Sequence, residues 1–127
     1  TDEIMEIFPL KLVFKNKENL IETFRNKYND KTIYCIGRYE DDKYYNGQCW
    51  VICSIALAQI LLKLLKENPN MYKKYSNVPT TILNKVLSLD RNNILPEQFN
   101  PLTKEGFSAD KLTWNYSELY FLINLIL

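Results

Sequence analysis

Cys49 stands where a polar turn meets the longest apolar run of the chain. The turn is Asn46-Gly47-Gln48, and the apolar run extends from Val51 to Leu65 without proline or glycine. Such a run predicts a helix, and a thiol at a helix N-terminus feels the partial positive charge of the unpaired N–H groups, which favours the thiolate. The type and position of Cys49 therefore predict a nucleophile.

The residues around Cys49 allow a functional and a structural interpretation. Trp50 is predicted to shield the thiolate beneath a substrate groove, and Tyr44 and Tyr45 belong to an acidic, tyrosine-rich loop that would form a substrate-recognition rim. Trp50 is equally typical of a core anchor, the loop of a solvated segment, and Cys49 of an unreactive buried thiol. The local sequence leaves both interpretations open.

The run Gly47-Gln48-Cys49-Trp50-Val51 resembles the nucleophile motif of papain-like cysteine peptidases, including viral leader-type proteases and deubiquitinases. It also matches the Gly-Gln-Cys-Trp-Val run of transglutaminases. The resemblance implies a thioester acyl-enzyme on Cys49, with a side-chain N–H of Gln48 or Asn46 added to the oxyanion site. It implies a protein or peptide substrate, of which a ubiquitin-like protein is one candidate, and no cofactor.

The sequence contains no histidine, which is the general base that these families use. Either another segment or a second chain completes the domain, or the chain is a degenerate relative, or the motif is a chance match. We expect a thiol-dependent hydrolase of peptide or isopeptide bonds whose histidine lies outside this chain. The alternatives are a transglutaminase-like acyl transferase and a catalytically inactive papain-like interaction module.

Composition narrows the class of protein. The 127 residues fit a single domain, 1–127, which the resemblance would make the N-terminal portion of a larger cysteine peptidase domain. A net charge of +1 argues against nucleic acid as a partner, and the apolar run is shorter than the roughly 20 residues of a membrane span.

Three cysteines at spacings typical of neither a disulfide scaffold nor a zinc motif indicate a reducing, cytoplasmic location. Adjacent Asp41 and Asp42 do not predict a metal site.

Hydrophobic periodicity predicts an α+β, mainly helical fold around a central buried helix at about 49–67. The resemblance would make this arrangement the helical half of a papain-like fold. The other expected elements are an extended N-terminal segment over 4–14, a helix over 18–28, a short strand over 32–36, a helix over 79–89, an irregular loop over 90–104 and a terminal helix over 117–127.

Overall fold

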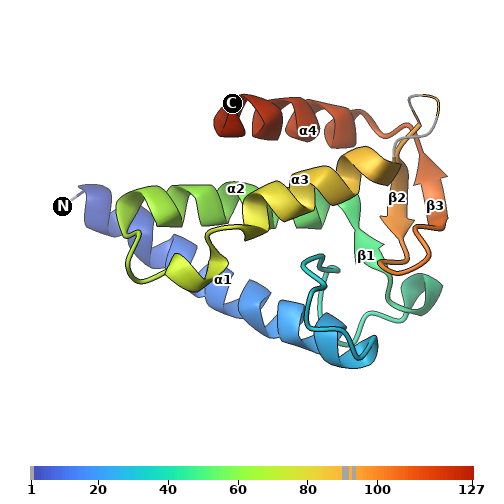
Figure 1. Cartoon of the computed structure of the whole chain (residues 1–127), viewed down its shortest axis with the longest axis horizontal. Helices are drawn as coiled ribbons and strands as arrows, with labels where there is room; N and C mark the ends of the chain where they lie inside the picture. Colours follow the sequence, from blue (N-terminus) through green and yellow to red (C-terminus); the bar gives the residue numbers. More distant parts are fainter. Residues whose placement is uncertain (1, 90–91, 93) are drawn as a thin grey trace.

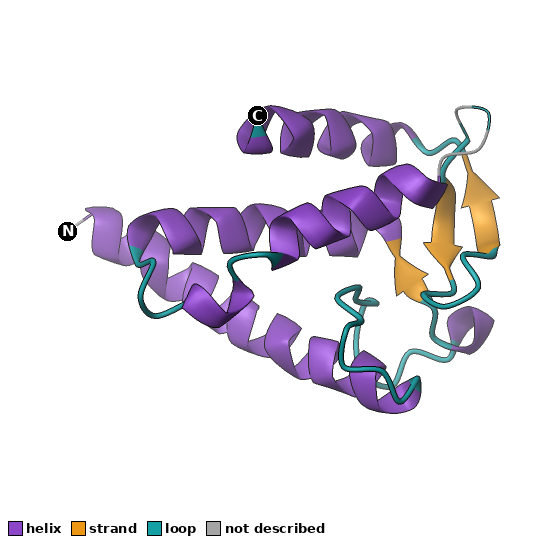
Figure 2. Ribbon diagram, viewed as in Figure 1, coloured by secondary structure: helices purple, strands orange, loops and turns teal. Residues whose placement is uncertain are grey.

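The computed structural model describes residues 2–89, 92 and 94–127, with side chains from Val13 onwards. It contains four long helices and a small sheet (Figures 1 and 2), which confirms the mainly helical α+β prediction. The helices are α1 (Asp2–Lys27), α2 (Val51–Glu67), α3 (Val78–Leu89) and α4 (Thr113–Ile126), the short 3-10 helices are η1 (Tyr44–Asn46) and η2 (Lys73–Tyr75), and the strands are β1 (Cys49–Trp50), β2 (Pro96–Phe99) and β3 (Gly106–Asp110).

Helix α2 is the centre of the molecule and packs against α1, α3 and α4 (Figure 1). Its apolar residues surround most of the helix, and Ile55, Leu57, Ala58 and Leu61 are completely buried. The predicted central helix is therefore confirmed. It begins at Val51, two residues later than expected, because Cys49 and Trp50 pair with β2 as a short strand.

The N-terminal half differs from the prediction in two places. The segment over 4–14 is helical, not extended, so the short N-terminal β element is absent and α1 runs through Pro9 to Lys27. Its apolar residues also fit a four-residue spacing, and Phe14 is fixed edge-on between the rings of Tyr72 and Tyr75. The predicted strand over 32–36 is a loop that contributes one backbone hydrogen bond, from Trp50 N to Ile36 O.

The three strands form an antiparallel sheet in the order β1-β2-β3 at one end of the helices (Figure 2). The prediction of an irregular loop over 90–104 missed β2 and the turn that leads to β3; residues 90, 91 and 93 lie outside the described residues. Leu95 and Phe99 are completely buried, whereas Leu102 in the hairpin turn is exposed. The hairpin thus continues the core.

Helices α3 and α4 agree with the predicted elements apart from the start of α4. Helix α4 begins at Thr113, four residues earlier than expected, and buries Asn115, Leu119 and Leu122. Within the described part of the chain, none of the helices combines the length and the hydropathy needed to cross a membrane.

Candidate functional site

The loop over residues 36–48, here called the tyrosine loop, is fixed by a disulfide at its base and by Lys27 of α1 near its end. A disulfide joins Cys35 to Cys49 across its base. Near its end, Lys27 Nζ donates hydrogen bonds to the carbonyl oxygens of Asn46 at 2.6 Å and Gly47 at 3.1 Å. Partial burial lowers the pKa of Lys27. Gly47 has φ of +66° and lies so close to the backbone that a Cβ would come within 2.5 Å of the Asp42 carbonyl oxygen.

Arg38 and Asp42 form a bidentate ion pair in the middle of this loop. Nε of Arg38 lies 2.7 Å from Oδ2 of Asp42, and Nη2 lies 2.9 Å from Oδ1. These hydrogen bonds hold the pKa of the buried Asp42 carboxyl below its ordinary value and raise the pKa of Arg38. Because Asp42 uses only two of the N–H groups of the guanidinium, the remaining donors can bind another polar group.

Aromatic rings surround the Arg38 guanidinium. Its central carbon lies 4.6 Å from the centroid of the buried Trp50 ring and 5.3 Å from the ring centroids of both Tyr39 and Tyr44. Tyr44 is in turn edge-on to Tyr45, with 4.7 Å between ring centroids. Tyr39, Tyr44 and Tyr45 are each about half exposed. The loop therefore presents a cation among aromatic faces to its surroundings.

The β2–β3 hairpin lies beside this loop and contains a β-bulge at Glu97. Pro96 pairs with Asp110 and Gln98 with Phe107, so Glu97 alone faces two residues, Ser108 and Ala109. Ser108 has a left-handed φ of 66°, which a β-bulge accommodates. Ser108 Oγ donates a hydrogen bond to Glu97 Oε1 at 2.7 Å. Gln98, on the opposite face of the strand, is completely buried, whereas Glu97 is half-buried.

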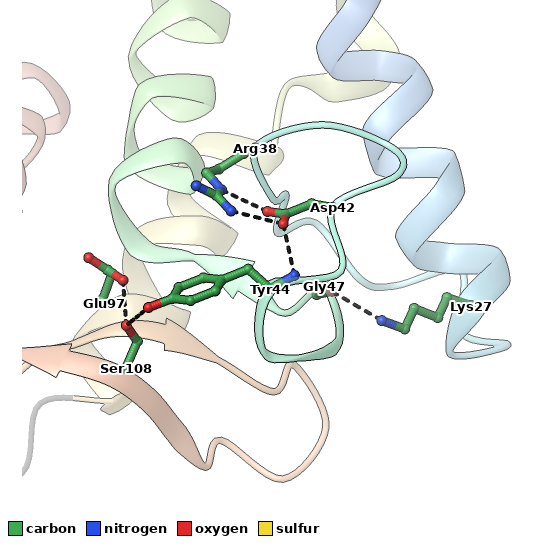
Figure 3. A network of polar contacts seen from close by, with 7 residues as sticks. All are labelled: Lys27, Arg38, Asp42, Tyr44, Gly47, Glu97 and Ser108. Atoms are coloured by element: carbon green, nitrogen blue, oxygen red, sulfur yellow. Dashed lines mark hydrogen bonds and ion pairs between the residues drawn. The ribbon is translucent and has the colours of Figure 1, made fainter.

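The loop and the hairpin meet at Tyr44. Its hydroxyl lies 3.3 Å from Ser108 Oγ, although the two residues are 64 positions apart in sequence. Figure 3 shows the resulting network from Arg38 and Asp42 on the loop to Glu97 on the hairpin. A half-buried carboxylate, an arginine and exposed aromatic rings therefore lie at one end of the molecule.

The residues predicted to carry chemistry are in different environments. Cys49 is completely buried and bonded to Cys35, so its sulfur is not a thiolate here. Gln48 is buried, donates to Tyr45 O at 3.1 Å and accepts from the Tyr28 hydroxyl at 3.3 Å, so its amide holds the loop.

The other predicted residues divide between the surface and the interior. Asn46 is exposed and gives its carbonyl oxygen to Lys27, Trp50 is buried beneath Arg38, and Tyr44 and Tyr45 are exposed. The remaining thiol, Cys53, is half-buried, and burial raises its pKa. Among the described residues, no group of three or more histidine, cysteine, aspartate or glutamate side chains could hold a metal ion.

A comparison with solved structures identifies the fold. The chain superposes on a glycoside hydrolase family 15 glucoamylase from Hypocrea jecorina with a TM-score of 0.70 and 20% sequence identity, over 89% of this chain and 26% of that one. The chain thus has the fold of about a quarter of that enzyme.

A comparison of sequences also matches a protein named as a glycosyl hydrolase. An uncharacterized glycosyl hydrolase of Methanocaldococcus jannaschii is 30% identical over 122 residues, which are 91% of this chain and 20% of that protein. The chain thus spans about a fifth of the length of this relative. No family model matches the chain.

These matches overturn the predicted resemblance to papain-like peptidases and to transglutaminases. The predicted thiol hydrolase, the acyl transferase and the inactive papain-like module are wrong as functions, because the relatives over almost the whole chain are glycoside hydrolases. The matching motif, Gly47 to Val51, covers five residues only. In this fold it forms the turn into β1 and the start of α2, with the cysteine bonded in the interior.

The sequence reasoning missed Glu97, Ser108, Arg38 and Asp42 as members of one site. The loop was predicted as a recognition rim on the basis of its tyrosines, without the ion pair inside it. A signal for the hairpin was present, since Pro96, Gln98 and Phe99 flank a single acidic residue before a turn that contains Asn100 and Pro101. Sequence spacing alone does not bring Ser108 to Glu97 or Tyr44 to Ser108.

Proposed function

We propose that these residues are part of a longer glycoside hydrolase and that Glu97 is one of the two carboxyl groups of its reaction. The observation that carries this proposal is the Glu97 carboxylate on a β-bulge, which accepts a hydrogen bond from Ser108 and lies opposite a loop of aromatic and cationic side chains. The likeness to two glycoside hydrolases supports it.

Glycosidic bonds are generally hydrolysed by two carboxyl groups on either side of the bond. One donates a proton to the leaving oxygen. The other is ionised and either takes a proton from the attacking water or attacks the sugar itself. We assign Glu97 the second role, in which the carboxyl group acts as an acceptor, because its Oε1 accepts a hydrogen bond from the Ser108 hydroxyl. The proton donor would come from outside these 127 residues, in keeping with the fraction of the relatives that the chain spans.

The tyrosine loop has the properties of a carbohydrate-binding wall. Sugar rings have apolar faces that pack on aromatic rings and hydroxyl groups that bind charged and polar side chains. Tyr44 and Tyr45 would supply the rings, and the free N–H groups of Arg38 would bind sugar hydroxyls. The buried Trp50 lies beneath Arg38 and supports it. The prediction of Tyr44 and Tyr45 as substrate-binding residues is thus proposed for a different substrate, whereas the buried Trp50 would act only through Arg38.

The experiment measures hydrolysis of a panel of glucose-containing oligosaccharides by the complete polypeptide that contains these residues. Glu97→Gln removes the charge with little change in shape, and we expect kcat to fall about 1,000-fold with an unchanged thermal midpoint. Glu105→Gln, at an exposed position in the hairpin turn, is the matched control and should retain full activity. Activity of Glu97→Gln at the wild-type level would reject the proposal.

A further inference from the structure

Tyr44, Ser108 and Glu97 form a directed chain of hydrogen bonds. A serine hydroxyl has a single proton. Ser108 donates this proton in a hydrogen bond to Glu97 Oε1, with 2.7 Å between the two oxygens, because an ionised carboxylate can only accept. The contact of 3.3 Å between Tyr44 and Ser108 must therefore have the tyrosine hydroxyl as its donor. Each donor in such a chain polarises the next, so the bond at Glu97 depends on the bond made by Tyr44.

Tyr44 is itself held by the ion pair of the tyrosine loop. Its backbone N donates to Asp42 Oδ1 at 3.0 Å, and the same carboxylate binds Arg38 through two hydrogen bonds. The guanidinium of Arg38 also lies over the Tyr44 ring. Figure 3 shows Tyr44 reaching from this pair across to the hairpin. Its hydroxyl is therefore placed by the loop, whereas its target belongs to β3.

We propose that Tyr44 is a positioning residue for Glu97, which acts through Ser108 and links the sugar-binding loop to the reacting carboxylate. This inference rests on the proposed function. The hydroxyl of Tyr44 fixes the orientation of Glu97, and the ring of the same residue belongs to the binding wall. The two contributions separate experimentally, because Tyr44→Phe keeps the ring and removes only the hydroxyl.

The first test is kinetic and uses the complete polypeptide. We expect Tyr44→Phe to lower kcat about 10-fold, since a poorly oriented group loses much of its effect, and to change KM less than about 2-fold. The matched control is Tyr120→Phe, on the exposed surface of α4, which should leave both parameters unchanged. An unchanged kcat in Tyr44→Phe, or an effect on KM alone, would overturn the positioning role.

A double-mutant cycle tests whether Tyr44 acts through Ser108. Ser108→Ala should lower kcat at least as much as Tyr44→Phe. The double variant should then equal Ser108→Ala, because the tyrosine has lost the group through which it acts. Losses that multiply in the double variant would show that Tyr44 acts by another route and would contradict the proposal.

A spectroscopic measurement separates failure of this inference from failure of the proposed function. The ¹³C signal of the Glu97 carboxyl, assigned by its loss in Glu97→Gln, reports the hydrogen bonding of that group without any turnover. We expect this signal to move in Tyr44→Phe and to stay in place in Tyr120→Phe. A signal that does not move in Tyr44→Phe rejects the positioning role, even when Glu97→Gln is inactive. A signal that moves in an enzyme indifferent to Glu97→Gln rejects the catalytic role of Glu97 instead.

Discussion

The helical body, made of α1 to α4, and the site end, made of the tyrosine loop and the β2–β3 hairpin, are stabilised in different ways. The body is held by apolar side chains, with α2 packed against all the other helices. The site end contributes Ile36 and Phe99 to the same core and is further held by individual contacts: a disulfide, an ion pair and a short chain of hydrogen bonds. Apolar burial is not directional and tolerates variation, whereas polar contacts work only in one geometry.

Residues other than glycine adopt a left-handed backbone in the loop and the hairpin, and also at Asn29, Asn92 and Lys111. Tyr45, Asn46 and Ser108 have left-handed φ angles of 49°, 64° and 66°. Such conformations cost energy for residues other than glycine and persist where their surroundings enforce them. At Ser108 the gain is a hydroxyl aimed at Glu97. The apolar packing of the body thus stabilises the fold enough to offset the conformational cost of the left-handed residues in the loop and the hairpin.

The largest expected effect on stability comes from the centre of the body. Leu61 is completely buried in α2, so Leu61→Ala removes well-packed methyl groups and leaves a cavity. We expect the free energy of unfolding to fall by about 4 kcal/mol. Urea unfolding of the complete polypeptide measures this loss. Below the unfolding transition kcat should stay near the wild-type value, and a large loss of kcat there would remove the distinction between body and site.

Removal of the disulfide should affect both regions. The bond joins two cysteines that are 14 positions apart and closes the segment that contains the whole tyrosine loop. Replacing both Cys35 and Cys49 by serine should cost about 3 kcal/mol, since the unfolded chain is no longer constrained. It should also raise KM, because no disulfide then holds the two ends of the loop together. The control is Cys53→Ser, which leaves the disulfide intact and should have a small effect. Equal effects of the two variants in thermal unfolding would refute this role.

The smallest of these effects concerns the ion pair inside the loop. Hydrogen bonds from Arg38 hold the pKa of Asp42 below its unfolded value of about 4. The pair therefore stabilises the fold above about pH 4, and this stabilisation disappears as the pH falls through the lowered folded-state pKa. Asp42→Asn should cost about 1 kcal/mol at pH 7, because Arg38 is partly exposed. Unfolding midpoints of variant and wild type should converge in acid; a constant difference down to about pH 2 would contradict the ion-pair explanation.

The sequence predicted the body better than the site. The apolar run of α2 indicates a helix because it contains no proline or glycine and is rich in good helix formers, and the apolar residues of α3 recur at helical spacing. Residues 4–14 fit both an extended and a helical pattern, and packing of Phe14 on residues far along the chain decides between them. The contacts of Tyr44 with Ser108 and of Cys35 with Cys49 depend on how distant segments fold together. A reactive residue type and a five-residue motif therefore led to the prediction of Cys49. The candidate carboxylate, Glu97, lies in a hairpin for which the turn residues were the signal in the sequence.

A structure of the complete polypeptide with a bound oligosaccharide tests the proposed site most directly. We predict a sugar ring against Tyr44 and Tyr45, hydroxyl groups bound by Arg38, and the reacting carbon beside the Glu97 carboxylate. The molecule offers an alternative in a cavity of about 170 Å³, lined by Asp30, Tyr34, Cys35, Ile82, Lys85 and Phe99 among others. An oligosaccharide bound in that cavity, with no sugar near Glu97, would contradict the assignment of Glu97 and of the tyrosine loop.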